Sequence, residues 1–304
     1  MPLVPTGELV AAGPVCAFNV ITLEHAEAIV AGAEAADRAV VLQVSENAVR
    51  FHRRLAPIAA AARAVAASAT VDVALHLDHA VSAELWREAP EHGFGSVMVD
   101  ASRLPYRENV AATRAAAEFA HGRGLWVEAE LGTVGGKDGE PPVDPHSPGA
   151  RTDPDEAASY VAQTGVDALA VAVGSAHAMT VRDAVLDHGL IGRLRAAVAV
   201  PLVLHGSSGV PDAELRRAVA GGIVKVNIGT ALNTALTGSV RRTLAAQPEL
   251  VDPRRWLAPA REAMAESVTR FCRVVSGDGP AGAGTAGDGP AGAESGLAST
   301  GAAP

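Results

Sequence analysis

The feature that most constrains the fold of this 304-residue chain is a regular alternation of short apolar runs with longer, alanine-rich segments. Segments 23–36, 107–122 and 211–222 place apolar residues three and four positions apart, as amphipathic helices do. Near-continuous apolar strands separated by helices predict a parallel sheet covered on both sides. The eight strand-like runs are 15–20, 40–45, 73–79, 96–102, 125–132, 168–174, 201–208 and 223–230.

Eight strand–helix units within about 230 residues fit the size of a (β/α)8 TIM barrel, and we predict this fold. A doubly wound sheet is the alternative, but the Gly-x-Gly-x-x-Gly turn of dinucleotide-binding sheets does not follow the first strand. Segment 253–275 predicts a further helix or two. We therefore expect one domain over 1–275. The remainder, 276–304, repeats GDGPAGA and is expected to be a disordered low-complexity tail.

Charge and composition exclude several classes of protein. The net charge of −9 argues against a broad surface for nucleic acid. We expect no membrane association, because no apolar run reaches the roughly 18 residues of a membrane span. The first 20 residues do not resemble a signal peptide. Cys16 and Cys272 match no metal-binding spacing, and we expect two reduced thiols in a cytoplasmic protein.

Polar side chains gather at the ends of the strand-like runs. In a barrel, the carboxyl ends of all strands meet at one rim, which holds the active site. His79, His177 and His205 follow three different strands and should therefore face a common point. Three imidazoles with an open position are typical of catalytic zinc, with Asp100 and Glu130 as orienting groups or ligands of a second cation. The alternative is that each histidine is satisfied separately in the core. His76 lies one step deeper, and we interpret it as buried support.

Two loops rich in small residues follow the last two strands. Gly206, Ser207 and Ser208 precede a helix near residue 211, and "NIGT" at 227–230 precedes another. Backbone N–H groups at helix N-termini bind anions, and barrels often bind phosphate after strands seven and eight. An ordinary turn with a helix cap is the alternative. Together with the predicted metal, the two loops favour a phosphorylated substrate that chelates zinc through oxygen.

These segments resemble a known family. The matching stretches are FNVITLEHAEAIV, HLDHA, SVMVDASRLPYRENV, VEAELGTVGG, GVDALAVAVGSAHA, PLVLHGSSGVP and VKVNIGTAL. In this order over residues 1–275, they are similar to the class II, metal-dependent aldolases of fructose and tagatose bisphosphate. The resemblance implies a TIM barrel, zinc with a further divalent or monovalent cation, and a homodimer or homotetramer.

The resemblance also implies roles for individual residues. His79, His177 and His205 would bind zinc, and Asp100 and Glu130 would match an alternative metal position. Asp78 would transfer the proton of the C4 oxygen, and Asp138 would move protons at C3. The residues that would bind dihydroxyacetone phosphate are Asn19, Ser45, Ala178, Gly206, Ser207, Ser208, Asn227, Ile228, Gly229 and Thr230. No Schiff-base lysine is needed, although Lys225 lies within the last strand.

The chain departs from the family pattern in and near the segment 133–155, which we expect to be a mobile loop over the rim, with a solvated linker as the alternative. Where the family has Gly-Gly-x-Glu-Asp, this chain has Gly-Gly-Lys-Asp-Gly, so Asp138 or Glu140 would replace the usual acid. Ala178 stands where the family has glycine, and a left-handed backbone would be strained there. Arg103 replaces a common histidine, and Gly229 differs from the usual Asp, Asn or Ala.

The leading hypothesis is reversible cleavage of a ketose 1,6-bisphosphate, foremost fructose 1,6-bisphosphate, to dihydroxyacetone phosphate and glyceraldehyde 3-phosphate. Tagatose 1,6-bisphosphate or another aldol of dihydroxyacetone phosphate is the alternative substrate. A zinc hydrolase could use the same three histidines, but hydrolysis does not require a fixed, distant phosphate. A non-catalytic paralogue that binds a sugar phosphate is the third hypothesis, and the altered loop favours it.

Overall fold

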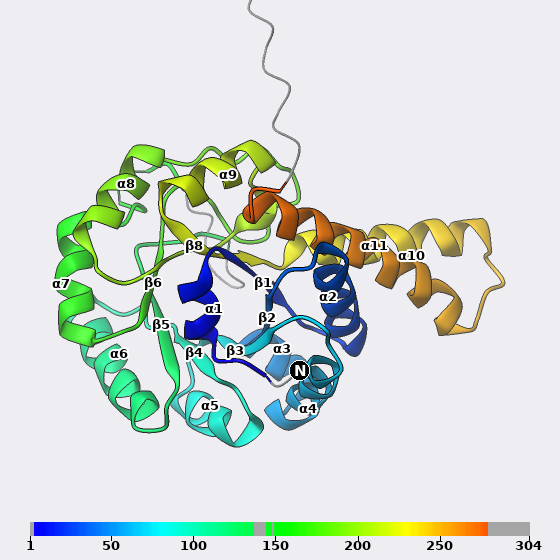
Figure 1. Ribbon diagram of the computed structural model, residues 1–304, viewed down its shortest axis with the longest axis horizontal. Coiled ribbons are helices and arrows are strands. Elements are labelled where there is room, and N and C mark those ends of the chain that lie inside the picture. The colour runs from blue at the N-terminus through cyan, green and yellow to red at the C-terminus, as the bar shows by residue number, and fades with distance from the viewer. Residues whose placement is uncertain (1–2, 137–143, 148, 279–304) are drawn as a thin grey trace, which may run out of the picture.

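The computed structural model describes residues 3–136, 144–147 and 149–278 of the chain. Eight parallel strands pair in sequence order, and the last strand pairs with the first to close a barrel (Figure 1). The predicted (β/α)8 fold is therefore confirmed. The strands are β1 (Val15–Asn19), β2 (Val40–Ser45), β3 (Val73–Ala80), β4 (Ser96–Val99), β5 (Trp126–Leu131), β6 (Ala168–Val171), β7 (Leu202–Leu204) and β8 (Ile223–Ile228).

Helices surround the barrel, because each strand turns its second apolar face outward toward an amphipathic helix. The expected helix at 23–36 has the observed bounds, and 253–275 forms one helix that contains Pro259. The helices are α1 (Thr6–Ala12), α2 (Leu23–Ala36), α3 (Glu46–His52), α4 (Leu55–Ala67), α5 (Ala83–Glu88), η1 (Ala89–His92), α6 (Tyr106–His121), α7 (Pro154–Thr164), α8 (His188–Ala197), η2 (Ser207–Gly209), α9 (Asp212–Gly221), α10 (Thr230–Ala246) and α11 (Pro253–Val275).

Several strands are shorter than the apolar runs that predicted them. The run 201–208 contains only the three strand residues Leu202–Leu204, and the run 96–102 ends as a strand at Val99. In both cases the polar residues at the end of the run leave the ladder and form the rim. In these two strands the rim begins where the pairing stops, and Asp100 and His205 are the first residues beyond it.

The amino end of the barrel is covered by α1, which lies over the opening in the view of Figure 1. Leu9 and Val10 of α1 are buried in a small apolar cluster with Val15, Ala17 and other residues from the strand starts. The Thr6 hydroxyl is 2.5 Å from the hydroxyl of Ser96 inside the barrel. Access to the interior is therefore from the opposite, carboxyl end.

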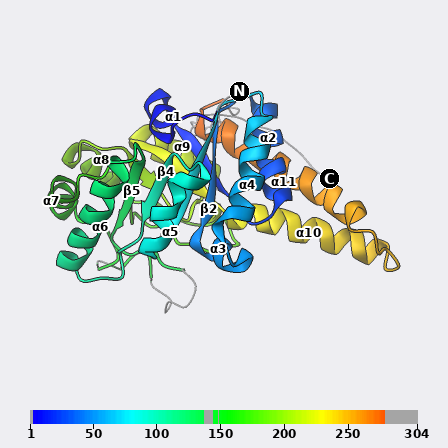
Figure 2. The ribbon, with the colours of Figure 1, turned by 90° about the horizontal axis from the view of Figure 1, so that it is seen from below.

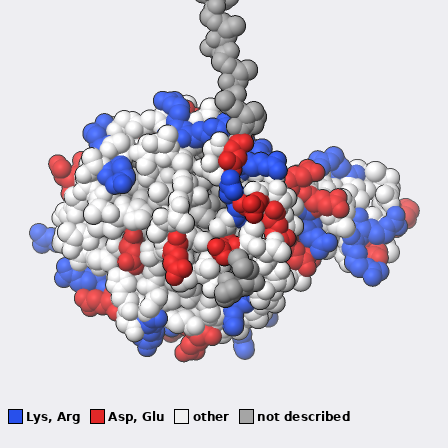
Figure 3. All heavy atoms as spheres, viewed as in Figure 1, with Lys and Arg blue, Asp and Glu red and all other residues white. Residues whose placement is uncertain are grey.

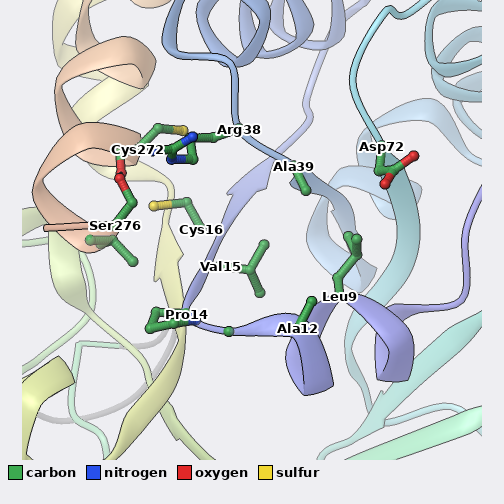
Figure 4. A pocket seen from close by; sticks show the side chains of 12 residues that line it. Leu9, Ala12, Pro14, Val15, Cys16, Arg38, Ala39, Asp72, Cys272 and Ser276 are labelled. Carbon is green, nitrogen blue, oxygen red and sulfur yellow. The ribbon is translucent and has the colours of Figure 1, made fainter. Parts of the chain in front are cut away.

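A hollow of about 200 Å³ lies beside α1, between the starts of the strands and the end of α11 (Figure 4). Cys16 of β1 and Cys272 of α11 line it, and both are free and buried. Burial raises the pKa of the Cys16 thiol, as does a hydrogen bond with Cys272. The sequence, in which these residues are far apart, gave no sign of this contact.

The helices α10 and α11 pack against each other and extend away from the barrel as an arm (Figures 1 and 2). Leu232 and Ser239 are the buried residues of α10, and the residues of the helix after Ser239 are half-buried or exposed. Val251, at the far end of the arm, is 85% exposed. The arm therefore presents much of its length to solvent in the single chain.

Acidic and basic side chains are interspersed on the face over which α1 lies, and neither sign forms a continuous area there (Figure 3). Within the described residues, no helix combines the length and apolarity required to cross a membrane. The described chain continues three residues beyond α11, to Asp278. The rest of the expected tail, 279–304, lies outside the described residues.

Candidate active site

His79 lies near the end of β3, at an irregularity in the barrel. The register between β3 and β4 shifts between Leu77 and Ala80, and His79 itself has a positive φ of 48°. This local twist directs the His79 ring into the carboxyl-end rim. Its Nδ1 is 2.7 Å from the carboxylate of Asp100, which follows β4. Such a hydrogen bond fixes the ring and leaves Nε2 for another partner.

His177 comes from the irregular segment after β6. Its backbone N–H donates to the carbonyl of Gly135, in the loop after β5, at 2.7 Å. Gly136 has φ 84°, and a Cβ there would come within 2.3 Å of the His177 carbonyl oxygen. The next residue, Ala178, has φ 58°, so the strain expected from an alanine at this position is present. The His177 backbone is thus enclosed by the Gly135–Gly136 loop.

His205 follows β7 directly and is fully buried. Gly206 has φ 67°, and its lack of a side chain allows the backbone of Ala176 to approach closely. The His205 Nδ1 is 3.1 Å from the Nε2 of His79 and 3.6 Å from a carboxylate oxygen of Glu130. Three ring pairs with centroids 4.8 to 5.6 Å apart join His79, His177 and His205.

The structure brings four of the predicted metal ligands together: His79, Glu130, His177 and His205, with one donor atom from each lying within 4.8 Å of the others. Three imidazoles and a carboxylate are a donor set that suits zinc, and the group is buried or half-buried. Burial lowers the pKa of His79, but the carboxylates of Asp78 and Asp100 outweigh it and raise this pKa to about 9. The site thus concentrates negative charge, which favours a cation.

Asp100 lies behind His79 and is not one of these four donors. Its second carboxylate oxygen accepts a hydrogen bond from the Ser102 hydroxyl at 2.6 Å. His76, which we expected to be support, also lies outside the group of four: it is fully buried, and its Nδ1 is 2.8 Å from the Ser96 hydroxyl. Burial, followed by the charge of Lys225, lowers the pKa of His76. The ring is therefore neutral at pH 7.

Asp78 precedes His79 and is 2% exposed. Its Oδ2 accepts hydrogen bonds from the side-chain amides of Asn19 at 2.9 Å and Gln43 at 3.4 Å. Its Oδ1 is buried and accepts no hydrogen bond from the described part of the chain. One carboxylate oxygen is thus fixed by side chains from β1 and β2, and the other has no hydrogen-bond partner among the described residues.

The predicted phosphate-binding residues come from two adjacent loops. Ser207 and Ser208 begin η2, and Gly229 and Thr230 begin α10. The two loops are joined by a hydrogen bond from the backbone N–H of Ala231 to the Ser208 hydroxyl, at 3.0 Å.

Other residues on the expected list have different positions. Ser45 caps α3 by accepting from the Ala48 N–H at 3.2 Å, and Ile228 is fully buried within β8. Asn227 is directed toward Lys225 and His205. Ala178 is exposed beside His177, and Gly229 is in close contact with Asn19. Asp138 and Glu140, the candidate acids of the loop, lie outside the described residues.

The sequence model of the family described as fructose-bisphosphate aldolase class-II matches residues 12–280. The chain belongs to this family. It is 38% identical over 253 residues to the fructose-bisphosphate aldolase of Staphylococcus aureus strain Mu50, covering 83% of this chain and 87% of that protein. The fructose-bisphosphate aldolase of Geobacillus stearothermophilus is 38% identical over 270 residues, covering 87% of this chain and 92% of that protein. The YdjI aldolase of Escherichia coli K12 is similar in structure, with a TM-score of 0.79, 31% identity and coverage of 91% and 99%.

The structure of this class II aldolase also reveals polar residues that sequence reasoning did not assign to the site. Glu128 in β5 and Lys225 in β8 are fully buried and paired at 2.8 Å, directly below His205. Gln43 in β2 is fully buried beside Asp78. A signal for two of them was present: Glu128 and Lys225 each lie two residues before a rim residue, Glu130 and Asn227, and therefore face the same side of their strands.

Proposed function

We propose that this protein is a zinc-dependent class II aldolase that reversibly cleaves fructose 1,6-bisphosphate to dihydroxyacetone phosphate and glyceraldehyde 3-phosphate. The observation that carries the proposal is the group of three histidines and Glu130 at the carboxyl rim, beside the isolated oxygen of Asp78. Relatives named fructose-bisphosphate aldolase support fructose 1,6-bisphosphate as the substrate. The fully buried Lys225 is paired with Glu128, which agrees with chemistry that uses no Schiff base.

The rings of His79 and His205 are held by carboxylates in the metal-free protein. His79, His177 and His205 would hold zinc together with Glu130, and Asp100 fixes the His79 ring from behind. Bound zinc would polarise the ketose carbonyl as a Lewis acid. Asp100 and Glu130, from neighbouring strands, are the residues we propose for a further cation position.

Asp78 is the residue that we propose to accept and return the proton of the C4 hydroxyl. Its Oδ2 is held by Asn19 and Gln43, so Oδ1 keeps a fixed direction toward a substrate at the metal. A fixed general base of this kind contributes typically about 10²- to 10⁴-fold to the rate. For the proton at C3 we propose Asp138, from the loop after β5.

The substrate phosphate would bind at η2 and the start of α10. Gly206, Ser207 and Ser208 would contact it from one loop, and Gly229 and Thr230 from the other. The positive end of the helix dipole of the 17-residue α10 would attract an anion there. Ser45, Ala178, Asn19, Asn227 and Ile228 complete the set that we propose to enclose dihydroxyacetone phosphate. This fixed anion site favours an aldolase over a zinc hydrolase.

We propose that the chain forms a homodimer or homotetramer. The extended arm of α10 and α11, with Val251 exposed at its end, supports association between copies. Light scattering coupled to size-exclusion chromatography would measure the assembly directly, and a monomer would contradict the proposal.

A coupled assay of triose phosphate release from fructose 1,6-bisphosphate tests the function, with tagatose 1,6-bisphosphate in parallel. We expect cleavage that EDTA abolishes and zinc restores. Asp78→Asn should lower kcat about 10²- to 10⁴-fold, because the amide cannot accept the proton. Asp72→Asn, just before β3 at the opposite end of the same strand, is the control and should keep wild-type activity. Full zinc loading without cleavage of either sugar would favour the non-catalytic paralogue.

A further inference from the structure

A second layer of polar side chains lies below the four metal donors, inside the barrel. Glu128, Lys225 and Asn227 belong to it, and the first two are fully buried. The Lys225 ammonium donates to Glu128 Oε2 and to Asn227 Oδ1, each at 2.8 Å. The proposed reaction assigns no role to Glu128 or Lys225. Both charges are expensive to bury, so their purpose requires an explanation.

This layer meets the site at His205. The Nδ1 of the ring faces the metal donors, whereas its Nε2 points down, 2.8 Å from Glu128 Oε1. A carboxylate can only accept at that distance, so the ring must carry its proton on Nε2 and donate it to Glu128. The lone pair of Nδ1 is then left facing His79 and Glu130, where a metal would lie.

Asn227 does not compete with Glu128 for this proton. Its Oδ1 is engaged by Lys225, so its amide nitrogen faces the His205 Nε2, at 3.0 Å. An amide nitrogen has no lone pair available for a hydrogen bond. The amide N–H groups can only donate and would favour an unprotonated Nε2, whereas the Glu128 carboxylate can only accept and requires a protonated one. The contact with Glu128 is shorter and charge-assisted, so it decides the tautomer. Lys225 holds both groups in this arrangement.

We propose that Glu128 and Lys225 act as a positioning pair for His205. Glu128 fixes the Nε2-protonated tautomer and the tilt of the ring, and Lys225 fixes Glu128 by its other oxygen. This inference rests on the proposed zinc site and deepens it, because it explains how a histidine that follows a strand of only three residues keeps one orientation. It also assigns a role to one of the two lysines of the chain.

Glu128→Gln tests the proposal in the full-length protein. The amide has the shape of the carboxylate but can present either oxygen or nitrogen to Nε2, so the tautomer is no longer fixed. We expect the zinc dissociation constant, measured by competition with a chelating dye, to rise about 10- to 100-fold, the usual effect of losing such a supporting partner. Lys225→Met should have an effect of the same direction.

If Glu128 and Lys225 act as a pair, the effects of their two substitutions on zinc affinity should not be additive. Once Glu128 is an amide, Lys225 has no carboxylate to hold, so Lys225→Met should weaken zinc binding further by less than it does alone. The matched control is Ser96→Ala, an equally buried polar residue of the barrel interior that contacts His76. Its zinc affinity should stay within about 3-fold of wild type, even if thermal unfolding shows a loss of stability.

A measurement on the unmodified protein keeps the proposal testable if variants fail to fold. Nitrogen-15 NMR of the histidine rings should show the Nε2-protonated tautomer for His205 with zinc bound. Protonation at Nδ1, or a zinc affinity of Glu128→Gln equal to that of Ser96→Ala, would overturn the inference and leave the proposed function intact. A wild-type protein that binds zinc but cleaves no sugar would refute the function, while the affinities would still decide the role of Glu128.

Discussion

Replacing Gly136 with alanine tests whether the loop after β5 holds His177 in the metal site. The added Cβ would lie 2.3 Å from the His177 carbonyl oxygen, on a residue whose φ is 84°. The neighbouring carbonyl of Gly135 accepts the hydrogen bond of the His177 N–H. An alanine at residue 136 therefore forces either His177 or the loop to move.

Movement of His177 and movement of the loop cost similar amounts of free energy. If the loop stays, the left-handed alanine costs about 1–2 kcal/mol, and the overpacking about 1–3 kcal/mol. If the loop lifts, the lost hydrogen bond costs about 1 kcal/mol. The loop also carries Val134, which is fully buried, and its exposure adds about 1.5–3 kcal/mol. The loss is at least about 2 kcal/mol in either case, which corresponds to roughly 30-fold in an equilibrium constant.

We expect Gly136→Ala to weaken zinc binding by roughly that factor, because His177 must be returned to its place before it can bind the metal. Chelator competition would measure it, and urea unfolding of the metal-free protein would report the accompanying loss of stability. Gly149→Ala is the control in the same loop, since a Cβ there meets nothing within 4 Å. Equal zinc affinities of the two variants, within about 3-fold, would refute this reasoning.

Three further predictions follow from the geometry. Ala178→Gly should raise the free energy of unfolding in urea by about 0.5–1 kcal/mol, since relief of the φ of 58° exceeds the entropic cost of glycine; a less stable variant would contradict the strain. Zinc binding at pH 7 should release about one proton from His79, whose pKa of about 9 keeps it protonated in the metal-free protein, and the release should vanish well above pH 9. Calorimetry in buffers of different ionisation heat would measure this, with pH-independent release as the contrary result. Cys16 and Cys272 should resist aromatic disulfide reagents in the native protein and react when it unfolds, because burial raises the pKa of Cys16 and excludes the reagent; fast native reaction would exclude the buried position.

The sequence was sufficient for the barrel and for the convergence of the three histidines, because both depend on patterns that are local in the chain. Apolar runs define the strands, and the convergence of parallel strands at one rim brings His79, His177 and His205 together. The residues at which the strands end were predicted less accurately. The run 201–208 was expected to be a strand throughout, yet pairing stops after Leu204, where the polar part of the run begins at His205.

Residues below the rim were harder to predict, since their roles depend on pairing across the barrel. Lys225 contacts Glu128, which is 97 positions away, and nothing in either strand alone indicates the partner. The helix α1 was also missed, because Thr6–Ala12 is too short for helical periodicity to show. The placement of Asp100 behind His79, apart from the four donors, depends on the twist at β3, which the sequence does not reveal.

The three histidines lie in or after β3, β6 and β7, so the candidate metal site unites segments that are far apart in the sequence. His79 and His205 are separated by 126 positions, yet their ring nitrogens are 3.1 Å apart. A partly formed barrel that lacks β3 or β7 can offer only part of this set. If zinc binds here as proposed, tight binding therefore requires that these strands are already assembled. During refolding, tight metal uptake should follow the assembly of β3 to β7 rather than precede it, so that the ion would report when these distant segments have come together.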